Sequence, residues 1–562
     1  MDSRQAILEA RYLHEGEDES MMWDRVARTW AIDPGDYEDF YEMMSTLKAL
    51  PNTPAIANAG RERQQGSACF VLPIDDSLNV GDASIMKTLD AATRVHATGG
   101  GTGFSFGRLR GRGEMISSTG RPSPGSVEIL KMYSDAIGRI SQGGVRWGAN
   151  MGVLPINHPD IEEFISCKQN EFVRGDAEIH LETMLQTTLD YPAEVRATQK
   201  LLEEYYVSKN HQGTIHNFNI SVAIDDDFML RRRFDGHDRD LWERIVYGAW
   251  SNGEPGILWM ERINERALHP EKIEATNPCG EVPLLPNEAC VLGSIDISKH
   301  TLGRRGIDWG ALADTTRVLT RLLDNVVELQ DYPLPIIKKT HKYYRKIGVG
   351  IMGLADAFIQ MELIYGEQES IRTAAEIMKF VQNISWNESE AIGRRRGFYP
   401  GYVEGMPKRR NLMVQVVAPT GTISRIARCS FGIEPNYAKV QESYILGATE
   451  PYIDRHKYAN SEWFITTTEV TLDQHIDMLC AIQAFTDQAV SKTCNAPMDA
   501  TPEDIEAAFV RAYEGGAKGL TVLRTGSRVK VTIKDHSGKH DEDDPLEDVA
   551  IAVDCVSGVC AL

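Results

Sequence analysis

From Cys69 to Arg524, short apolar runs broken by glycine alternate with windows of helical periodicity. Runs such as SACFVLPID, GGGTGFSFGRL, GANMGVLPI and NFNISVAI fit buried strands, whereas GSVEILKMYSDAIGRI repeats apolar residues at three-to-four spacing. Strands that alternate with helices are typical of the α/β class. Further runs (GVGIMGLADAFI, LMVQVVAPTGTIS, GLTVLRT) continue the pattern, so we expect one large barrel-like α/β domain, spanning residues 61–530, and not several small ones.

Both ends of the chain differ from this pattern. Residues 1–60 carry helical periodicity in RQAILEARYL and YEDFYEMMSTLKAL, and PNTP is expected to stop the second helix. Residues 531–562 hold six acids in DEDDPLED (541–548) and close on AIAVDCVSGVCAL, which predicts a flexible acidic tail. Within the large domain, the polar stretch 169–215 is interpreted as a surface insertion.

Composition excludes several classes of protein. With 562 residues, 42% of them hydrophobic, the chain can bury a large core, and no run approaches the eighteen apolar residues of a membrane span. A net charge of −21 argues against nucleic acid as a partner. Nine scattered cysteines and an N-terminus without the apolar core of a signal peptide indicate a reducing, cytoplasmic compartment.

The segment NPCGEVPLLPNEACVLGSIDIS (277–298) holds the most suggestive cysteine. In an extended loop, residues two apart point to the same side, so Asn277, Cys279 and Glu281 are expected to face one ligand. A zinc site needs about four ligands with short paired spacing, which this segment lacks, and we predict no metal site. Four other cysteines lie in settings typical of small buried apolar residues: Cys167, Cys429, Cys480 and Cys494.

Two further motifs suggest chemistry. CVSGVC (555–560), at the end of the tail, suits thiol–disulfide exchange because exchange needs an accessible thiolate. APTGTIS (418–424) precedes a helix-like stretch and is suited to aim backbone N–H groups at an anion. The glycines of ATGGGTGFSFG are not followed by GK[ST], so we expect close strand packing there and no phosphate-binding P-loop.

Taken together, these motifs resemble the catalytic subunit of a ribonucleotide reductase, most like the adenosylcobalamin-dependent class II enzymes. The resemblance covers most of the chain and rests on seven motifs in the family's order: SACFVLPIDDSL, GTGFSFGRLR, SQGGVRWGANMGVL…HPDIEEFI, NFNISVA, NPCGEVPLLPNEACVLGSI, APTGTIS and KGLTVLRTGSR. It implies a ten-stranded α/β barrel with a central active-site loop, preceded by a helical N-terminal region.

The resemblance also implies roles for the cysteines. Cys279 would carry a thiyl radical that removes the 3′ hydrogen of the ribose, with Glu281 as the base for the 3′-hydroxyl proton and Asn277 hydrogen-bonding the same region. Cys69 and Cys290 would form the reducing pair. Cys555 and Cys560 would then regenerate that pair and be reduced by a thioredoxin-like protein.

Nucleotide sites follow from the same resemblance. The substrate phosphates would contact Thr420, Gly421, Thr422 and Ser424, with Thr53 as a weaker addition because TP often only marks the end of a helix. A deoxynucleoside triphosphate effector would bind Asp76 and Arg110 at a homodimer interface, near loops 111–120 and 141–150, with Arg146 reaching toward the substrate base. A glycine-rich turn with a solvated arginine is the alternative for the second loop, and Trp147 departs from the small residue that the family pattern has there. We expect no ATP-cone domain before residue 1.

The radical source is the remaining alternative. Leu523 stands where class II chains usually have one tyrosine and class I chains have two, which favours adenosylcobalamin over a separate ferritin-like subunit. The CxSGxC form of the tail is instead common in class I. A glycyl-radical lyase would need an RVSGY-like segment near the C-terminus, and a non-catalytic nucleotide sensor would not need Cys69, Cys279, Cys290 and Glu281 together.

Overall fold

A computed structural model describes residues 3–138, 149–169, 215, 217–234, 236–443, 452–527 and 533–535. Several predicted features therefore lie outside the described residues: almost all of the 169–215 insertion, Arg146 and Trp147 with most of their loop, and the acidic tail with Cys555 and Cys560. Within the described ranges, no helix is both long and apolar enough to span a membrane.

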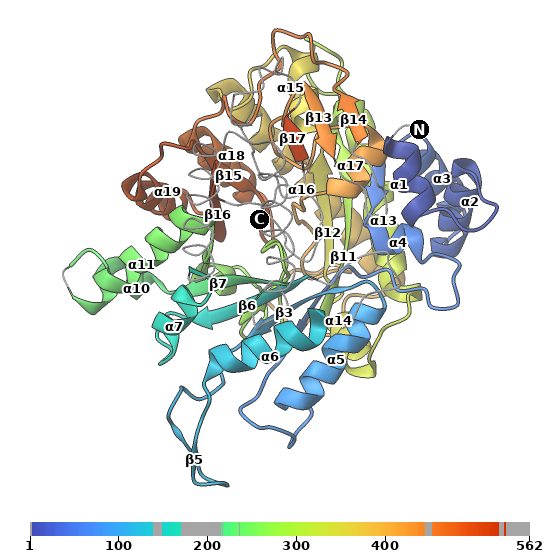
Figure 1. Ribbon diagram of the computed structural model, residues 1–562. Coiled ribbons are helices and arrows are strands. Elements are labelled where there is room, and N and C mark those ends of the chain that lie inside the picture. Colours follow the sequence, from blue (N-terminus) through green and yellow to red (C-terminus); the bar gives the residue numbers. More distant parts are fainter. Residues whose placement is uncertain are drawn as a thin grey trace, which may run out of the picture.

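Ten strands form one mixed sheet that wraps around the centre of the molecule (Figure 1). The strands are β1 (Ala49–Pro51), β2 (Cys69–Leu72), β3 (Gly101–Ser105), β6 (Asn150–Pro155), β7 (Phe218–Ile224), β8 (Gly256–Trp259), β11 (Glu288–Asp296), β12 (Ile347–Met352), β15 (Thr493–Ala496) and β16 (Gly519–Arg524). Most of the apolar runs noted in the sequence coincide with these strands, whereas LMVQVVAPTGTIS forms only isolated bridges and the start of α17. The expected α/β class is confirmed.

The sheet combines two sets of parallel strands. The strands β2, β3, β6, β7 and β8 are parallel to one another, and this set meets β11 and β16 in antiparallel pairs at its two edges. Isolated bridges between Val349 and Gln415 and between Val417 and Val490 connect β12 to the segment that leads into β15. These bridges close the sheet into a barrel.

Both faces of the barrel strands are buried, which explains why the strands appear in the sequence as continuous apolar runs. Successive side chains of a strand point to opposite faces. On β2, Phe70 and Leu72 therefore belong to the apolar layer beneath the helices, whereas Cys69 and Val71 belong to a second cluster in the interior of the barrel.

Helices cover the barrel from outside (Figure 1). The N-terminal region contributes α1 (Ser3–Arg11), α2 (Glu19–Trp30), α3 (Asp36–Ser45) and α4 (Thr53–Ala57). The other described helices are α5 (Ile85–Ala97), α6 (Ser126–Gly138), α7 (Ile161–Ser166), α10 (Asp226–Arg231), α11 (His237–Asn252), α12 (Met260–Glu265), α13 (Trp309–Leu329), α14 (Pro335–Tyr344), α15 (Leu354–Met361), α16 (Gln368–Arg396), α17 (Gly421–Ala427), α18 (Leu472–Gln483) and α19 (Pro502–Glu514).

Two expectations for the N-terminal region were wrong. The second of the two expected helices is α3, and it ends at Ser45. Ala49–Pro51 forms strand β1 instead, because pairing with β11 overrides the local helical pattern. Thr53 does not follow the end of a helix: it is the first residue of α4, where Pro54 is tolerated because the N–H it lacks would be unpaired.

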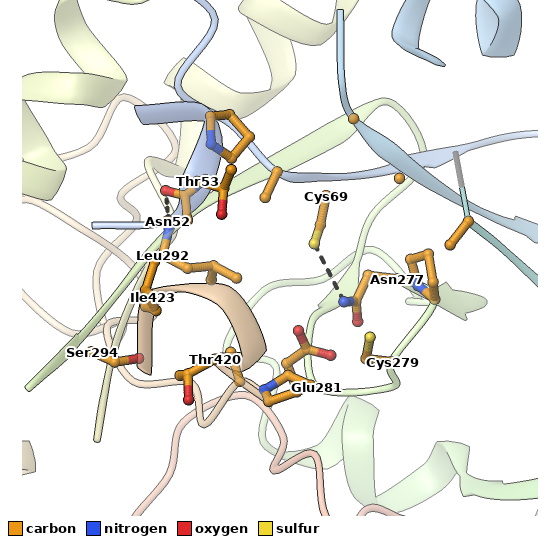
Figure 2. Close-up of a pocket in the computed structure, with 18 of the residues that line it drawn as sticks. Asn52, Thr53, Cys69, Asn277, Cys279, Glu281, Leu292, Ser294, Thr420 and Ile423 are labelled. Carbon is orange, nitrogen blue, oxygen red and sulfur yellow. Dashed lines mark hydrogen bonds between the residues drawn. The ribbon is translucent and has the colours of Figure 1, made fainter. Parts of the chain in front are cut away.

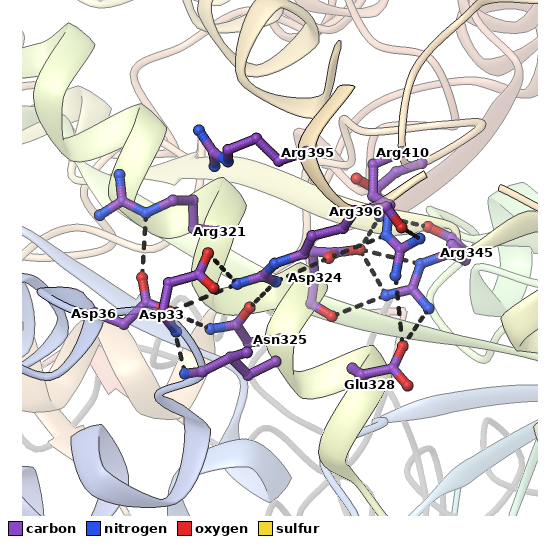
Figure 3. Close-up of polar contacts among 12 residues, drawn as sticks. Asp33, Asp36, Arg321, Asp324, Asn325, Glu328, Arg345, Arg395, Arg396 and Arg410 are labelled. Carbon is purple, nitrogen blue, oxygen red and sulfur yellow. Dashed lines mark hydrogen bonds and ion pairs between the residues drawn. The ribbon is translucent and has the colours of Figure 1, made fainter. Parts of the chain in front are cut away.

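A buried ionic network joins the N-terminal helices to the barrel (Figure 3). Asp324 of α13 has a fully buried side chain and pairs with Arg345 at 2.8 Å. Arg396, at the end of α16, lies 3.6 Å from Asp324 and 2.6 Å from Asp33, which precedes α3. Arg410 approaches Asp324 at 3.4 Å. One carboxylate thus holds three guanidinium groups, and one of those groups reaches the N-terminal region.

Replacing Asp324 by asparagine should lower the free energy of unfolding by about 3 kcal/mol, because it leaves the buried Arg345 and the partly buried Arg396 and Arg410 without their shared carboxylate. Urea denaturation measures the loss. Asp314→Asn on the same helix is the matched control, since Asp314 pairs with Arg317 but its side chain is 79% exposed. This control should change stability by less than about 0.5 kcal/mol. Equal effects of the two substitutions would contradict the role assigned to Asp324.

Candidate active site

The segment that carries Cys279 is the tip of a short hairpin. Strands β9 (Ala275–Thr276) and β10 (Pro283–Leu284) pair antiparallel, and Asn277 closes the loop between them. Its backbone N–H donates to the Val282 carbonyl at 3.2 Å, and its Oδ1 accepts from the Val282 N–H at 2.8 Å. Gly280 supplies a positive φ of 81°. The expected extended loop is therefore wrong: these hydrogen bonds fold the segment into a turn.

The hairpin fits inside the barrel because strand β3 has a glycine, Gly103, where the hairpin packs against it. A Cβ at Gly103 would be 1.8 Å from the Thr276 carbonyl oxygen, so no residue other than glycine fits there with the loop in place. Asn219 of β7 holds the loop from another side by donating to the Pro278 carbonyl at 2.9 Å. The prediction that the glycine-rich stretch provides close packing is confirmed.

Despite the turn, Asn277, Cys279 and Glu281 line one cavity (Figure 2). The cavity also contains Cys69 and two threonines, Thr53 and Thr420. Glu281 is 2% exposed, and its backbone carbonyl accepts from the Ala489 N–H at 3.0 Å, which fixes the carboxylate end of the loop. A thiol, a carboxylate and an amide therefore converge on one space, as radical and acid–base chemistry requires.

Cys69 and Cys290 are neighbours in space although 221 positions separate them in the chain. They lie opposite each other in the antiparallel pair of β2 and β11, and both are reduced. Opposed residues in such a pair have Cβ atoms about 5 Å apart, so a small approach suffices for a disulfide. Asn277 Nδ2 donates to Cys69 Sγ at 3.3 Å. Burial, with Cys69 nearby, raises the pKa of the Cys290 thiol well above its usual value.

The residues expected at the substrate phosphates gather around α17. Thr420 is its N-cap residue and lines the cavity, as does Thr53 at the start of α4. Ser424 is fully buried, and its hydroxyl lies 2.6 Å from Thr420 Oγ1, so it supports Thr420 from within the protein. Gly421 and Thr422 form the first turn of the helix.

Sequence analysis missed two residues next to this cavity, Arg11 and Tyr12. Arg11 Nη1 donates to Thr422 Oγ1 at 3.4 Å, and the Tyr12 hydroxyl lies 2.8 Å from Thr53 Oγ1. The N-terminal region therefore places a cation beside the first turn of α17. No local signal could have shown this, because Arg11 is 411 positions from Thr422 and its segment has an ordinary helical pattern.

A second, smaller cavity also reaches Cys279. Its lining comes from the other part of the barrel, β6 to β8 and β16, together with the segment before β15: Met151, Ser221, Ile257, Leu258, Gly280, Val490, Ser491, Lys492, Gly519, Leu520 and Thr521. Cys279 is the only residue shared by the two sets of lining residues among the described parts of the chain. The thiol therefore stands between two separate spaces.

The residues expected to hold an effector lie at the surface, away from these cavities. Arg110 Nε donates to Asp76 Oδ2 at 2.7 Å, and Arg110 Nη1 donates to the Met115 carbonyl at 3.0 Å. Met115 begins the hairpin of β4 (Met115–Ile116) and β5 (Arg121–Pro122), which overlaps the predicted loop 111–120 and projects from the body of the molecule (Figure 1). Asp76 and Arg110 are thus brought together, whereas Arg146 lies outside the described residues.

The four cysteines that we interpreted as structural are less uniformly buried than expected. Cys429 and Cys494 are buried, and burial raises the pKa of the Cys494 thiol to about 12. Cys167 and Cys480 are only partly buried. None of the four lines either of the cavities that reach Cys279 in the described part of the chain.

Comparisons with known proteins match two parts of the chain. A family model described as "Ribonucleotide reductase, barrel domain" matches residues 67–237, 236–410 and 408–523, and one described as "Ribonucleotide reductase, all-alpha domain" matches residues 4–64. The chain is 35% identical to a vitamin B12-dependent ribonucleoside-diphosphate reductase of Thermoplasma acidophilum, over 87% of this chain and 65% of the relative.

Two further comparisons agree with these. A protein with the same description from Mycobacterium tuberculosis H37Rv is 32% identical over 93% of this chain and 77% of the relative. The match therefore spans 65% and 77% of the length of these two relatives. The fold is similar to that of the Actinobacillus ureae class Id ribonucleotide reductase alpha subunit, with a TM-score of 0.72, 20% identity and coverage of 94% of this chain and 97% of that one.

Proposed function

Because the chain belongs to the ribonucleotide reductase family, we propose that it converts ribonucleotides to deoxyribonucleotides by radical chemistry at Cys279. One observation carries the proposal: Cys279, Glu281 and Asn277 face the same cavity as Cys69, whose partner in the sheet is Cys290. We propose a diphosphate as substrate, since the two relatives described above are named ribonucleoside-diphosphate reductases.

In this mechanism each residue at the cavity has one task. The Cys279 thiyl takes the 3′ hydrogen of the ribose, and the Glu281 carboxylate accepts the proton of the 3′-hydroxyl. Asn277 orients this end of the substrate and the Cys69 thiol together, because it belongs to the loop and donates to Cys69 Sγ. Cys69 and Cys290 then supply the hydrogens and electrons that remove the 2′-hydroxyl as water, and they end as a disulfide. Cys279 finally returns the hydrogen to the 3′ carbon and is again a thiyl.

The phosphates are proposed to lie at the α17 end of the cavity, near Thr420, Gly421 and Thr422, with Thr53 on the facing side and Ser424 supporting Thr420. Arg11 adds a positive charge at this end, through its contact with Thr422. Hydroxyl groups, backbone N–H groups and a guanidinium are the donors that phosphate oxygens accept from.

The cofactor proposed is adenosylcobalamin, as in the relatives named vitamin B12-dependent. When bound, it supplies the homolysis that generates an organic radical. The second cavity offers an approach to Cys279 from the side away from the proposed substrate, because its lining shares only Cys279 with the first cavity among the described residues. That lining mixes apolar residues such as Leu258 with hydroxyl groups such as Thr521 and the charged Lys492. Leu523 occupies β16 where a tyrosine relay would be needed, which disfavours the alternative of a ferritin-like radical subunit.

Adding adenosylcobalamin to the purified protein should produce deoxyribonucleotide from ribonucleoside diphosphate, without any second protein subunit. Cys279→Ser should abolish turnover, because a hydroxyl holds its hydrogen too strongly to act as the radical carrier, and nucleotide binding should remain. Cys429→Ser serves as the matched control, since Cys429 does not line either cavity that reaches Cys279. Product formation by Cys279→Ser, or activity that needs a ferritin-like subunit, would overturn the proposal.

The tail cysteines Cys555 and Cys560 are proposed to reduce the Cys69–Cys290 disulfide and to be reduced in turn by a thioredoxin-like protein. Replacing both by serine should spare one turnover of prereduced enzyme and block repeated turnover with thioredoxin. A small dithiol that enters the cavity should restore part of the rate. Rapid-quench measurement of product per active site distinguishes the two regimes, and unchanged turnover with thioredoxin would exclude the relay.

We propose a homodimer in which Asp76 and Arg110, with Arg146, hold a deoxynucleoside triphosphate between two subunits. Exposed apolar side chains beside the Asp76–Arg110 pair support this proposal, since Leu78 is 62%, Val80 81% and Met115 61% exposed. Adding dTTP should shift the light-scattering mass toward the dimer, because a ligand that spans both subunits favours association. A monomer with and without dTTP, with substrate choice still responding to dTTP, would contradict the shared site.

A further inference from the structure

The two sulfurs of the reducing pair are not equally accessible. Cys69 lines the substrate cavity and is 7% exposed, whereas Cys290 is fully buried and is not among the described lining residues. An incoming thiolate therefore reaches Cys69. Attack there forms a bond to Cys69 Sγ, breaks the Cys69–Cys290 bond and leaves the electron pair on Cys290. The leaving group is thus the buried sulfur.

A buried Cys290 thiolate is a poor leaving group. Its surroundings on the inner face of β11 are mainly apolar, and burial raises the pKa of its thiol well above the usual value. Departure of a thiolate slows as the pKa of the leaving thiol rises. Reduction of the disulfide at a useful rate therefore needs a proton donor close to Cys290.

Glu288 lies two residues before Cys290 on β11, and its side chain points to the same face of the strand. The register places Glu288 opposite Val71 and Cys290 opposite Cys69, so the carboxyl group lies next to the dithiol along the barrel interior. Residues two apart on a strand are separated by about 7 Å between Cα atoms, which the two side chains or one bridging water can span.

The surroundings of Glu288 suit a proton donor. The side chain is fully buried, and Oε2 accepts from Lys346 Nζ at 2.7 Å and from the Leu285 N–H at 2.9 Å. Oε1 is buried with no hydrogen-bond partner among the described residues. Burial raises the pKa of the Glu288 carboxyl despite the Lys346 charge. After donation, the carboxylate remains paired with Lys346.

Other charged and titratable groups face this position from the elements around it. Lys346 comes from the residue before β12, and its Nζ lies 3.3 Å from Nε2 of His269, which follows α12. Burial lowers the pKa of His269 to about 3, so this ring is neutral at physiological pH. Cys69, Glu271, Glu281 and Tyr344 also interact electrostatically with Glu288 or Cys290.

We propose that Glu288 gives its proton to Cys290 Sγ when the Cys69–Cys290 disulfide is reduced. The attacking thiolate becomes bonded to Cys69, Cys290 leaves as a thiol, and Glu288 becomes a carboxylate that later regains a proton from solvent. This inference rests on the proposed function of the cysteine pair, and the reductant is the dithiol of the tail or a small dithiol in its place.

The test follows reduction of the disulfide itself, without nucleotide or cobalamin. The full chain is oxidised, mixed with dithiothreitol over a range of pH, quenched by alkylation, and analysed by mass spectrometry for the Cys69–Cys290 bond. In the natural protein the rate should rise with pH as the attacking thiolate forms and then fall as Glu288 loses its proton. Glu288→Gln should react about 100-fold more slowly at pH 7 and should lack the falling limb.

Two further variants separate this role from a structural one. Glu434→Gln is the matched control, because Glu434 forms another buried pair with Lys492 at 2.6 Å and should leave the rate and pH profile as in the natural protein. The double variant Glu288→Gln with Lys346→Gln removes both charges and keeps a hydrogen-bonding pair, so it guards against misfolding caused by an unpaired lysine. It should be slowed as the single variant is.

A natural rate and pH profile in the folded single or double variant that carries Glu288→Gln would overturn the proposal. Recovery in the double variant alone would overturn it as well, because the slowing would then come from the unpaired Lys346 charge. The Glu288 effect without any ribonucleotide reduction by the natural protein would instead refute only the proposed function.

Discussion

The close approach of strand β3 and the Cys279 hairpin is the constraint on which the rest of the site depends. A barrel of ten strands normally fills its interior with side chains, and here the backbone of Gly103 leaves room for the Thr276 carbonyl. Once the hairpin lies in that space, Cys279 comes between two cavities and Asn277 comes within reach of Cys69. The missing Cβ thus determines where the thiol stands.

Buried ion pairs also hold distant segments of this molecule in place. Asp324 gathers three arginines between the helices, Glu288 and Lys346 pair in the barrel interior, and Lys492 and Glu434 pair beside the second cavity. Each buried pair carries a desolvation cost, so it contributes less to stability than to holding its segments in one arrangement. These pairs join segments far apart in the sequence, including the N-terminal helices and α16.

Sequence reasoning predicted the parts of the molecule that have local patterns. The strands β2, β3, β6, β7, β12 and β16 and the helices α1 and α6 coincide with apolar patterns in the sequence. The packing role of the β3 glycines was predicted because no GK[ST] motif follows them. The prediction for Ala49–Pro51 was wrong because pairing with β11 decides its conformation.

Long-range proximity was not predictable from local patterns. The pairing of Cys69 with Cys290 came only from resemblance to the family, since it depends on the register of two strands that lie far apart in the chain. Arg11 had no signal at all, because its role arises from contact with α17. The residues of the second cavity likewise come from separate segments of the chain.

The contacts of α1 also affect how this protein divides into parts. Thr53 lines the substrate cavity, Tyr12 touches Thr53, and Arg11 touches Thr422. Arg11, Tyr12 and Thr53 nevertheless belong to the region matched by the all-alpha family model. Arg4 fixes the same helix by donating to the Ile426 carbonyl at 2.6 Å. A chimaera that joined the first 60 residues of one relative to the barrel of another would therefore exchange one wall of the cavity along with the scaffold.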